Sequence, residues 1–192
     1  VLIDFSHPSA LTPLLDYATK HQLPAVIATT GLSTEQISQI RAASQQLPLF
    51  FTANMSLGVN QLAGLAKRAA SILGGQFDIE IIEKHHNQKI DSPSGTALML
   101  ADAISETIEE QPQYVYDRHA VRKKRSANEI GIHAVRGGTI VGEHEIIFAG
   151  RDEIITLSHT AMSKEVFAVG SINAALFLCA QPNGLYDMNS IV

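Results

Sequence analysis

The alternation of apolar and polar positions over the first 75 residues predicts strands and helices in turn. Three apolar runs have the length and composition of buried strands. They cover residues 1–5, 25–28 and 47–52. Three further segments carry apolar residues at helical spacing, and they cover residues 9–21, 33–46 and 60–73. Because short connections link these elements, the pattern predicts right-handed βαβ units, that is, a parallel sheet covered by helices.

The pattern changes after residue 76. Residues 78–83 read as a strand and 95–108 as a helix, followed by a polar stretch over 109–128. Three strand-like runs then alternate with glycine-containing turns, at residues 129–135, 140–148 and 153–159. Consecutive strands with short turns favour antiparallel pairing. A long apolar helix is expected over residues 164–180.

These two patterns together predict an α/β protein with two domains. A Rossmann-type parallel sheet, incomplete at its amino end, is expected from residues 1–56 and 166–192. An α+β domain with a mixed, largely antiparallel sheet is expected from residues 57–165. The chain opens inside a core strand without an initiator methionine, a pattern that indicates the remainder of a longer protein.

Composition then narrows the function classes. Hydrophobic residues make up 45% of the chain and charged residues 17%, as in ordinary globular proteins. The net charge of −5 argues against a nucleic-acid partner. No apolar stretch approaches the roughly 20 residues of a membrane span. The one cysteine, Cys179, favours a reducing cytoplasm, and its apolar neighbours predict that it lies in the core.

The densest chemistry lies in residues 83–97, which read EKHHNQKIDSPSGTA between a predicted strand and a predicted helix. Histidine titrates near neutrality, so of His85 and His86 we expect one to donate a proton and the other to bind an anion. Lys89 in the same loop can neutralise a carboxylate. The alternatives are ordinary surface histidines and a solvated lysine.

The turn that follows predicts an anion cradle. Ser94 or Thr96 can cap the next helix, and Gly95 permits close approach to its backbone. Free N–H groups and the helix dipole at such a start bind carboxylates or phosphates, although a plain helix start needs the same residue types. The whole stretch suits a small molecule that carries carboxylates and needs a proton.

Other segments give weaker signals. Loops at residues 29–31 and 52–55 end predicted parallel strands, where α/β folds bind nucleotides. A basic run at residues 122–125 is expected to be a solvated loop, with recruitment of an anionic ligand as the alternative. Three other histidines could bind a metal, but they lack a recognised ligand spacing, so no metal site is expected. They are His133, His144 and His159.

Taken together, these segments resemble the dihydrodipicolinate reductase family, whose members are 4-hydroxy-tetrahydrodipicolinate reductases. The resemblance runs from residue 1 to about residue 188, and residues 83–97 match the family signature. Further matching segments lie at residues 28–31, 52–56, 136–138, 141–144 and 184–188.

The resemblance implies hydride transfer from NADH or NADPH to a cyclic dicarboxylate imine, in the diaminopimelate route to lysine. It implies that His85 donates and accepts the proton and that Lys89 is a second proton donor. Substrate carboxylates are expected at His86, Ser94, Gly95 and Thr96. The nicotinamide end of the cofactor is expected at Ala28, Thr29, Thr30, Thr52, Ala53, Asn54 and Met55.

The resemblance also assigns roles to the domains. Residues 1–56 and 166–192 would bind the nucleotide, and residues 57–165 would bind substrate and form a homotetramer in the cytoplasm, without nucleic-acid or membrane partners. The family's glycine-rich phosphate-binding turn would lie before Val1. We therefore expect the catalytic and substrate residues to be present without the pyrophosphate cradle.

Two other functions stay open. One is a Rossmann-type oxidoreductase with another substrate, such as an aspartate dehydrogenase or an oxidoreductase acting on a sugar. The dicarboxylate cradle argues against it. The other is a non-catalytic remnant that lost its nucleotide site, and the presence of His85 and Lys89 argues against that.

Overall fold

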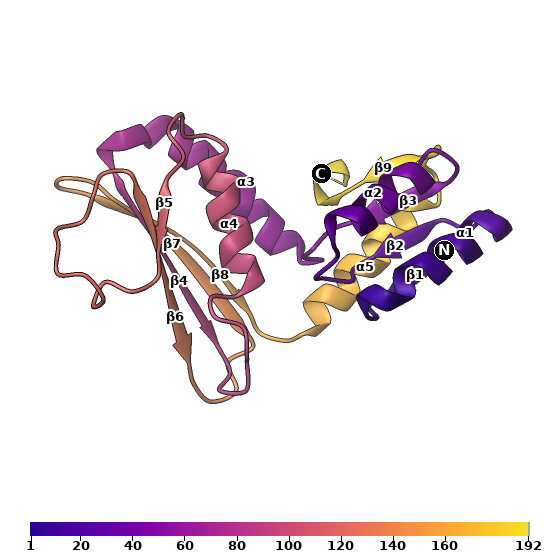
Figure 1. The fold of residues 1–192 in the computed structure, drawn as a ribbon, viewed down its shortest axis with the longest axis horizontal. Helices are drawn as coiled ribbons and strands as arrows, with labels where there is room; N and C mark the ends of the chain where they lie inside the picture. The colour runs from indigo at the N-terminus through magenta and orange to yellow at the C-terminus, as the bar shows by residue number, and fades with distance from the viewer. Residues whose placement is uncertain (192) are drawn as a thin grey trace. The chain divides into compact units, whose positions relative to one another are not determined.

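The computed structural model describes residues 1–191, which form two compact units (Figure 1). The mixed-sheet unit consists of Gly58–Lys164. The parallel unit consists of Val1–Leu57 together with the described residues from Glu165 onward. In the described part of the chain, no helix is long and apolar enough to cross a membrane.

The parallel unit contains a four-stranded sheet in the order β1-β2-β3-β9, with every neighbouring pair parallel. The strands are β1 (Leu2–Asp4), β2 (Ala25–Ile27), β3 (Pro48–Phe51) and β9 (Gly184–Tyr186). The helices are α1 (Leu11–His21), α2 (Thr34–Ala43) and α5 (Glu165–Leu178). Short 3₁₀ turns add η1 (Pro8–Ala10) and η3 (Met188–Ser190). The predicted Rossmann-type parallel sheet is confirmed.

Strand β2 shows why this sheet needs helices on both faces. All three of its residues are fully buried. Ala25 and Ile27 pack in one apolar cluster with residues of α1 and α2, whereas Val26 packs in another with residues of α5. Such continuous burial is typical of a central parallel strand.

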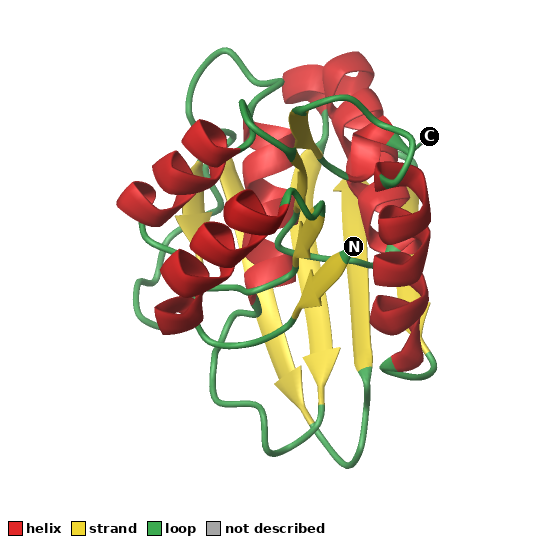
Figure 2. Ribbon diagram, turned by 90° about the vertical axis from the view of Figure 1, so that its right-hand side faces the viewer, coloured by secondary structure: helices red, strands yellow, loops and turns green. Residues whose placement is uncertain are grey.

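The mixed-sheet unit contains a five-stranded sheet in the order β5-β6-β4-β7-β8. The strands are β4 (Asp78–His85), β5 (Gln113–Val115), β6 (Glu129–Arg136), β7 (Gly142–Ala149) and β8 (Ile154–Ala161). Helices α3 (Leu57–Leu73) and α4 (Gly95–Ser105), with the 3₁₀ turn η2 (Gly74–Gln76), complete it. The long strands run side by side in Figure 2.

Pairing in this sheet is mixed, as predicted, but it is not a simple meander. Strand β4 lies between β6 and β7, parallel to β6 and antiparallel to β7. The turn from β6 to β7 therefore passes the end of β4 instead of closing a hairpin. This brings the turn at Gly137 against the carboxyl end of β4, where the Gly137 N–H donates to the His85 carbonyl at 2.9 Å.

Strand β4 carries the pattern that positions the site. Alternate residues are buried along its length, first Ile79 and Ile81, then Glu83 and His85. The two isoleucines belong to the apolar core formed with α3 and α4. Since successive side chains point to opposite faces, the same periodicity turns Glu83 and His85 toward the helix-covered face. The apolar stripe thus ends in two polar residues.

Two expectations about single residues are wrong. Cys179 is exposed, because α5 ends at Leu178 and the cysteine lies in the turn beyond the helix. Arg125, in the basic run, is not a solvated loop residue. Its guanidinium bonds Asp78 at 2.8 Å, Glu80 at 3.0 Å and the Glu129 carbonyl at 2.6 Å, so it anchors the loop to the sheet.

Candidate functional site

The buried carboxylate of Glu83 is the centre of the site. Arg136 reaches it with two N–H groups, one to each oxygen, both at 2.7 Å. The His85 Nδ1 lies 2.6 Å from the Glu83 Oε2, and the Ser94 N–H donates to the Glu83 Oε1 at 3.0 Å. The side chain of Glu83 has 0% exposure, so protein groups supply all of these partners.

These partners determine the charge of Glu83. Burial favours the neutral acid, but the hydrogen bonds from Arg136, His85 and the Ser94 backbone outweigh it and lower the pKa of Glu83 below its ordinary value. Glu83 is therefore a carboxylate at neutral pH, and Arg136 supplies the opposite charge.

The start of α4 joins the same network through Ser94. Its hydroxyl accepts the Ala97 N–H at 3.1 Å and so caps the helix. The same hydroxyl lies 3.0 Å from the His144 Nε2 on β7. Since the hydroxyl already accepts from Ala97, its own hydrogen is available for His144. Ser94 thus links the helix start to both Glu83 and His144.

His144 is a buried imidazole beside His85. Their ring centroids lie 5.2 Å apart in an edge-to-face arrangement. Burial first, and then the neighbouring His85, lower the pKa of His144 to about 4. His144 is accordingly neutral at physiological pH and can accept the hydrogen of Ser94.

The loop of residues 86–94 carries Lys89 and is held at several points. Its Asn87 N–H donates to the Gly138 carbonyl at 3.2 Å, and the Asp91 carbonyl accepts from Arg136 at 2.8 Å. Gly138 has φ +48°, a left-handed conformation that favours glycine. The Ser92–Pro93 peptide bond is cis.

Lys89 forms an ion pair with Asp91, its Nζ lying 2.8 Å from the Asp91 Oδ1. Burial raises the pKa of Asp91, but Lys89 and then the backbone of Gly95 lower it by more. The Asp91 carboxylate thus interacts with both Lys89 and the amino end of α4. These are two of the groups predicted to meet a substrate carboxylate.

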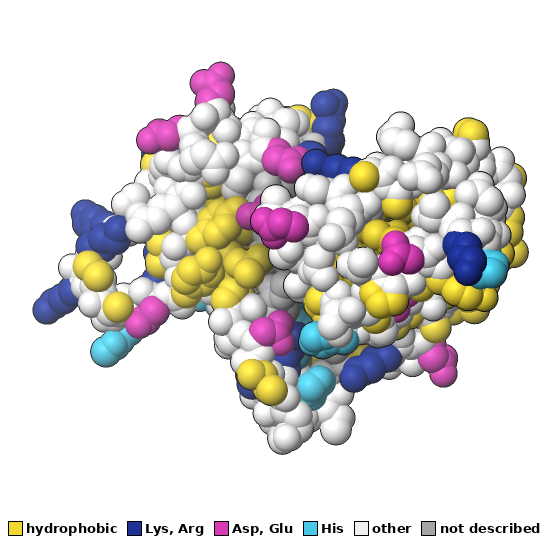
Figure 3. Space-filling model, turned by 45° about the vertical axis from the view of Figure 1, so that its right-hand side comes forward, with side chains coloured by type: hydrophobic (Ala, Val, Ile, Leu, Met, Phe, Trp, Pro, Cys, Tyr) yellow, Lys and Arg dark blue, Asp and Glu magenta, His cyan; other side chains and the backbone are white. Residues whose placement is uncertain are grey.

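The remaining predicted substrate residues lie around this network. Gly95 is exposed at the first turn of α4, while His86 and Thr96 are half-buried. Figure 3 shows histidine, acidic and basic side chains gathered at the lower end of the mixed-sheet unit.

The predicted cofactor residues lie in the parallel unit, after two neighbouring strands. The loop after β2 contains Ala28, Thr29 and Thr30, and the loop after β3 contains residues 52–55. Because β2 and β3 pair in parallel, both loops lie at the same edge of the sheet. This edge suits a nucleotide in α/β folds.

Internal hydrogen bonds shape these loops. The Thr29 hydroxyl donates to the buried Asp4 carboxylate at 2.6 Å, and the Asn54 side chain accepts the Ser56 N–H at 2.8 Å. Thr30 and Ala53 are exposed, whereas Met55 is buried. The exposed residues and the loop backbone fit contact with a nicotinamide, while the buried side chains fix the loop shape.

The three histidines considered as metal ligands do not form one group, although His144 and His159 are direct partners across β7 and β8. His144 pairs with Glu83 across β4 and β7 and lies on the buried face, whereas His133 pairs with Ile82 and bonds Glu80 at 2.7 Å. Because alternate residues of β4 face opposite ways, His133 and His144 lie on opposite faces of the sheet. Among residues 1–191 no group of three metal-binding side chains is present.

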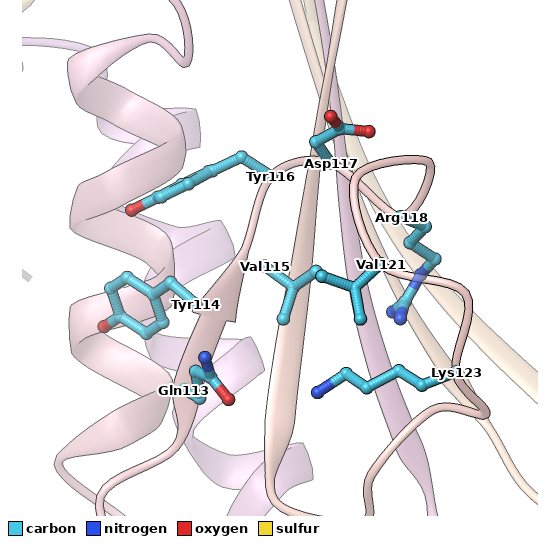
Figure 4. A pocket seen from close by; sticks show the side chains of 8 residues that line it. All are labelled: Gln113, Tyr114, Val115, Tyr116, Asp117, Arg118, Val121 and Lys123. Atoms are coloured by element: carbon cyan, nitrogen blue, oxygen red, sulfur yellow. The ribbon is translucent and has the colours of Figure 1, made fainter.

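A pocket of about 220 Å³ lies elsewhere, between β5 and the loop after it (Figure 4). Tyr114 and Tyr116 point toward α4, and Lys123 extends toward Gln113. Arg118 fixes this loop by bonding Glu129 and Glu80. The pocket contains no predicted site residue, and its polar groups serve to hold the loop.

Sequence reasoning missed three residues of the network. Glu83 opens the signature stretch but was given no role. Arg136 was noted only as part of a segment that matches the family, and His144 only as a possible metal ligand. The period of β4 alone places Glu83 on the face of His85. Arg136 and His144 reach them only through the pairing of β6 and β7 with β4.

Chemically, the site combines a histidine held by a carboxylate, a lysine in a clamped loop and an accessible helix start. Histidine can transfer a proton, and the lysine and helix start can bind carboxylate groups. The arrangement therefore suits proton transfer to a small anionic molecule.

Comparison with known protein families gives two matches that together cover most of the chain. The family model described as "Dihydrodipicolinate reductase, N-terminus" matches residues 1–55. The model described as "Dihydrodipicolinate reductase, C-terminus" matches residues 58–192.

Individual relatives agree with these matches. A protein of Caldanaerobacter subterraneus subsp. tengcongensis named 4-hydroxy-tetrahydrodipicolinate reductase is 56% identical over 100% of this chain and 76% of its own length. One of the same name from Clostridium tetani is 50% identical over 100% of this chain and 75% of its own length. The solved structure of a dipicolinate-bound dihydrodipicolinate reductase from Paenisporosarcina sp. TG-14 has a TM-score of 0.74 at 28% identity, covering 97% of this chain and 72% of that one.

Proposed function

The chain belongs to the dihydrodipicolinate reductase family, and from this premise we propose which of its residues carry out the reaction. Family membership makes it an oxidoreductase of the diaminopimelate and lysine pathway, a 4-hydroxy-tetrahydrodipicolinate reductase. NADH or NADPH, when bound, supplies the hydride for such a reduction.

In this proposal His85 gives the proton that the reduced substrate needs. The observation that carries the proposal is the placement of His85 beside the helix start that would hold the substrate. Its ring lies 5.2 Å from that of His144, which bonds the Ser94 cap of α4 at 3.0 Å. A proton carrier and an anion-binding helix end thus share one buried network.

The substrate carboxylates would be bound at the other end of this network. Lys89 supplies a positive charge, and the N–H groups at Gly95 and Thr96 supply hydrogen bonds and the positive end of the helix dipole. Ser94 and His86 complete the cradle. The dipicolinate bound to the Paenisporosarcina relative, a planar dicarboxylate, supports a ligand of this class.

We assign nucleotide binding to the parallel unit, with Ala28–Thr30 and residues 52–55 at the nicotinamide. Substrate binding and assembly belong to the mixed-sheet unit. The open face of its sheet bears exposed apolar side chains, Ile154 at 68% and Val135 at 45% exposure. Such a face suits contact between copies, and we propose a homotetramer in the cytoplasm.

Calorimetric titration of the full-length protein with pyridine-2,6-dicarboxylate tests the cradle. Saturable binding is expected, and Lys89→Ala should weaken it about tenfold or more because a charge-assisted contact is lost. Lys84→Ala is the matched control, since Lys84 on β4 is paired with Glu143 on β7 and lies outside the cradle. Equal binding by wild type and Lys89→Ala would contradict the assignment of Lys89.

Turnover of the full-length protein tests the proton donor. His85→Ala should lower kcat at least about 100-fold, the usual contribution of a general acid, while circular dichroism stays unchanged. A variant that retains wild-type turnover would remove His85 from the mechanism.

A further inference from the structure

We infer that Glu83 is a positioning residue, which holds the His85 ring with its proton on Nδ1 and its Nε2 directed at the substrate. This inference rests on the proposed function of His85. It adds a residue on which the proton transfer depends without any contact with the substrate.

Glu83 is a charged side chain buried in the protein. Glu83 occupies a position on β4 where the preceding inward residues are isoleucines, so an apolar side chain would satisfy the fold. A buried ion pair is weak as a source of stability, because desolvation of both ions offsets their attraction. The Glu83–Arg136 pair therefore calls for a reason other than packing.

The donors around Glu83 determine which nitrogen of His85 carries the hydrogen. An ionised carboxylate can only accept hydrogen bonds. Glu83 already accepts two N–H groups of Arg136 and the N–H of Ser94. At 2.6 Å the His85 Nδ1 must also be a donor, and it therefore carries a hydrogen. In neutral His85 the lone pair is then on Nε2, and in charged His85 the transferable proton is on Nε2.

The other edge of the His85 ring, with Nε2, lies beside Gly142 of β7. A Cβ added to Gly142 would lie 3.1 Å from the His85 Nε2. The glycine thus leaves Nε2 unobstructed on the side of β7. His144 packs edge-to-face against the same ring and limits its rotation. Glu83 holds one nitrogen, and Gly142 keeps space beside the other.

These contacts define how His85 would transfer its proton to the substrate. During protonation the Nε2–H bond breaks as the new C–H bond of the substrate forms, and the electron pair of the N–H bond stays on Nε2. His85 becomes the neutral Nδ1–H form, still bonded to Glu83. The carboxylate remains ionised throughout, because Arg136 stays bound to it.

Glutamine at position 83 reverses the tautomer. The Glu83 Oε1 accepts two N–H groups that cannot become acceptors, one from Arg136 and one from the Ser94 backbone, whereas the Oε2 accepts only one such group, from Arg136, and also faces the His85 Nδ1. The amide NH₂ of Glu83→Gln therefore replaces the Glu83 Oε2, where it loses one Arg136 bond but faces the His85 Nδ1, which can accept. His85 is then left with its hydrogen on Nε2 when neutral and cannot take part in the same proton cycle.

Two measurements test the inference. In the wild-type protein, ¹⁵N spectra of the histidine rings above neutral pH should show His85 with its hydrogen on Nδ1, its signals being identified by their loss in His85→Gln. In the full-length protein, Glu83→Gln should lower kcat about 100-fold with little change in the affinity for pyridine-2,6-dicarboxylate. Because the wild-type spectrum does not depend on Glu83→Gln, failure of that variant to fold leaves the test intact.

Glu80→Gln is the matched control. Glu80 lies on the opposite face of β4 and also bonds an arginine and a histidine, Arg125 at 3.0 Å and His133 at 2.7 Å. The kcat of Glu80→Gln should equal that of wild type. If loss of a carboxylate from β4 lowered kcat only by disturbing the strand, both variants would show the decrease.

The possible results distinguish the positioning role of Glu83 from the proposed role of His85 as proton donor. Wild-type turnover in His85→Gln would overturn the role of His85. Loss of turnover in His85→Gln together with full activity in Glu83→Gln would overturn the role of Glu83 alone. A wild-type His85 with its hydrogen on Nε2 would likewise overturn the tautomer assignment.

Discussion

At the scale of single residues, the ion pair between Lys89 and Asp91 bears on the anion binding that we propose for the site. The Asp91 carboxylate lies 2.8 Å from the Lys89 Nζ and also interacts with the backbone of Gly95. It thus occupies groups that we propose for a substrate carboxylate. This contact holds the loop, and in our proposal a bound dicarboxylate displaces it.

Asp91→Asn should therefore bind pyridine-2,6-dicarboxylate more tightly. The change removes a negative charge and a competitor from the cradle, and we expect an affinity gain of about two- to fivefold, the usual worth of a partly exposed ion pair. Calorimetric titration measures it, with Asp117→Asn as the control outside the cradle. Weaker binding would show instead that Asp91 orients Lys89 for the ligand.

At the scale of elements, the contact of α5 with the loop after β3 depends on one glycine. A Cβ at Gly170 would lie 1.8 Å from the Met55 carbonyl oxygen, a backbone atom that cannot rotate away. Met55 and its neighbours form the loop that we assign to the nicotinamide. The absence of a side chain at Gly170 thus allows α5 to pack directly against the backbone of this loop.

Gly170→Ala should destabilise the parallel unit by about 1–3 kcal/mol, since the helix and the loop must separate. Urea unfolding followed by circular dichroism measures the loss, and weaker NADH binding should accompany it. Gly64→Ala in α3 is the matched control. It also lies in a helix, but no atom would lie within 4 Å of its Cβ, so there alanine should be neutral or stabilising. Equal stability of Gly170→Ala and wild type would contradict this view of the contact.

At the scale of the whole molecule, the buried His144 makes folding stability depend on pH. Its pKa is about 4 in the folded protein against an ordinary value of 6.5. Between these values the unfolded chain binds a proton that the folded chain does not, so stability falls as the pH decreases from 6.5 to 4. The full difference amounts to about 3 kcal/mol.

His144→Gln should remove this part of the pH dependence, because a glutamine can still bond Ser94 but does not titrate. Free energies of unfolding at pH 7 and pH 5, from amide exchange of β4 and β7, compare the variant with wild type. The wild-type protein should lose more stability between the two pH values than the variant. An equal loss in both proteins would mean that His144 is not held neutral.

Much of this architecture followed from local pattern. The strands β1, β2 and β3 and the helices between them were predicted because each carries its own hydrophobic period, and a capping box of Ser33 and Gln36 begins α2. The strand β5 and the strand β9 were missed. Each has three residues, too few to show a period, and each exists because a longer strand offers it an edge to pair with.

The sequence by itself determined the alternating α/β pattern, the mixed sheet and, through the stretch around His85 and Lys89, the family and its reaction. Those features are local, being written in periodicity and in a contiguous signature. Only the tertiary structure decided that β4 lies between β6 and β7, and hence that Arg136 and His144 meet Glu83 and His85. Long-range strand pairing leaves no local period, so the buried network that orients the histidine becomes visible only when the sheet is assembled.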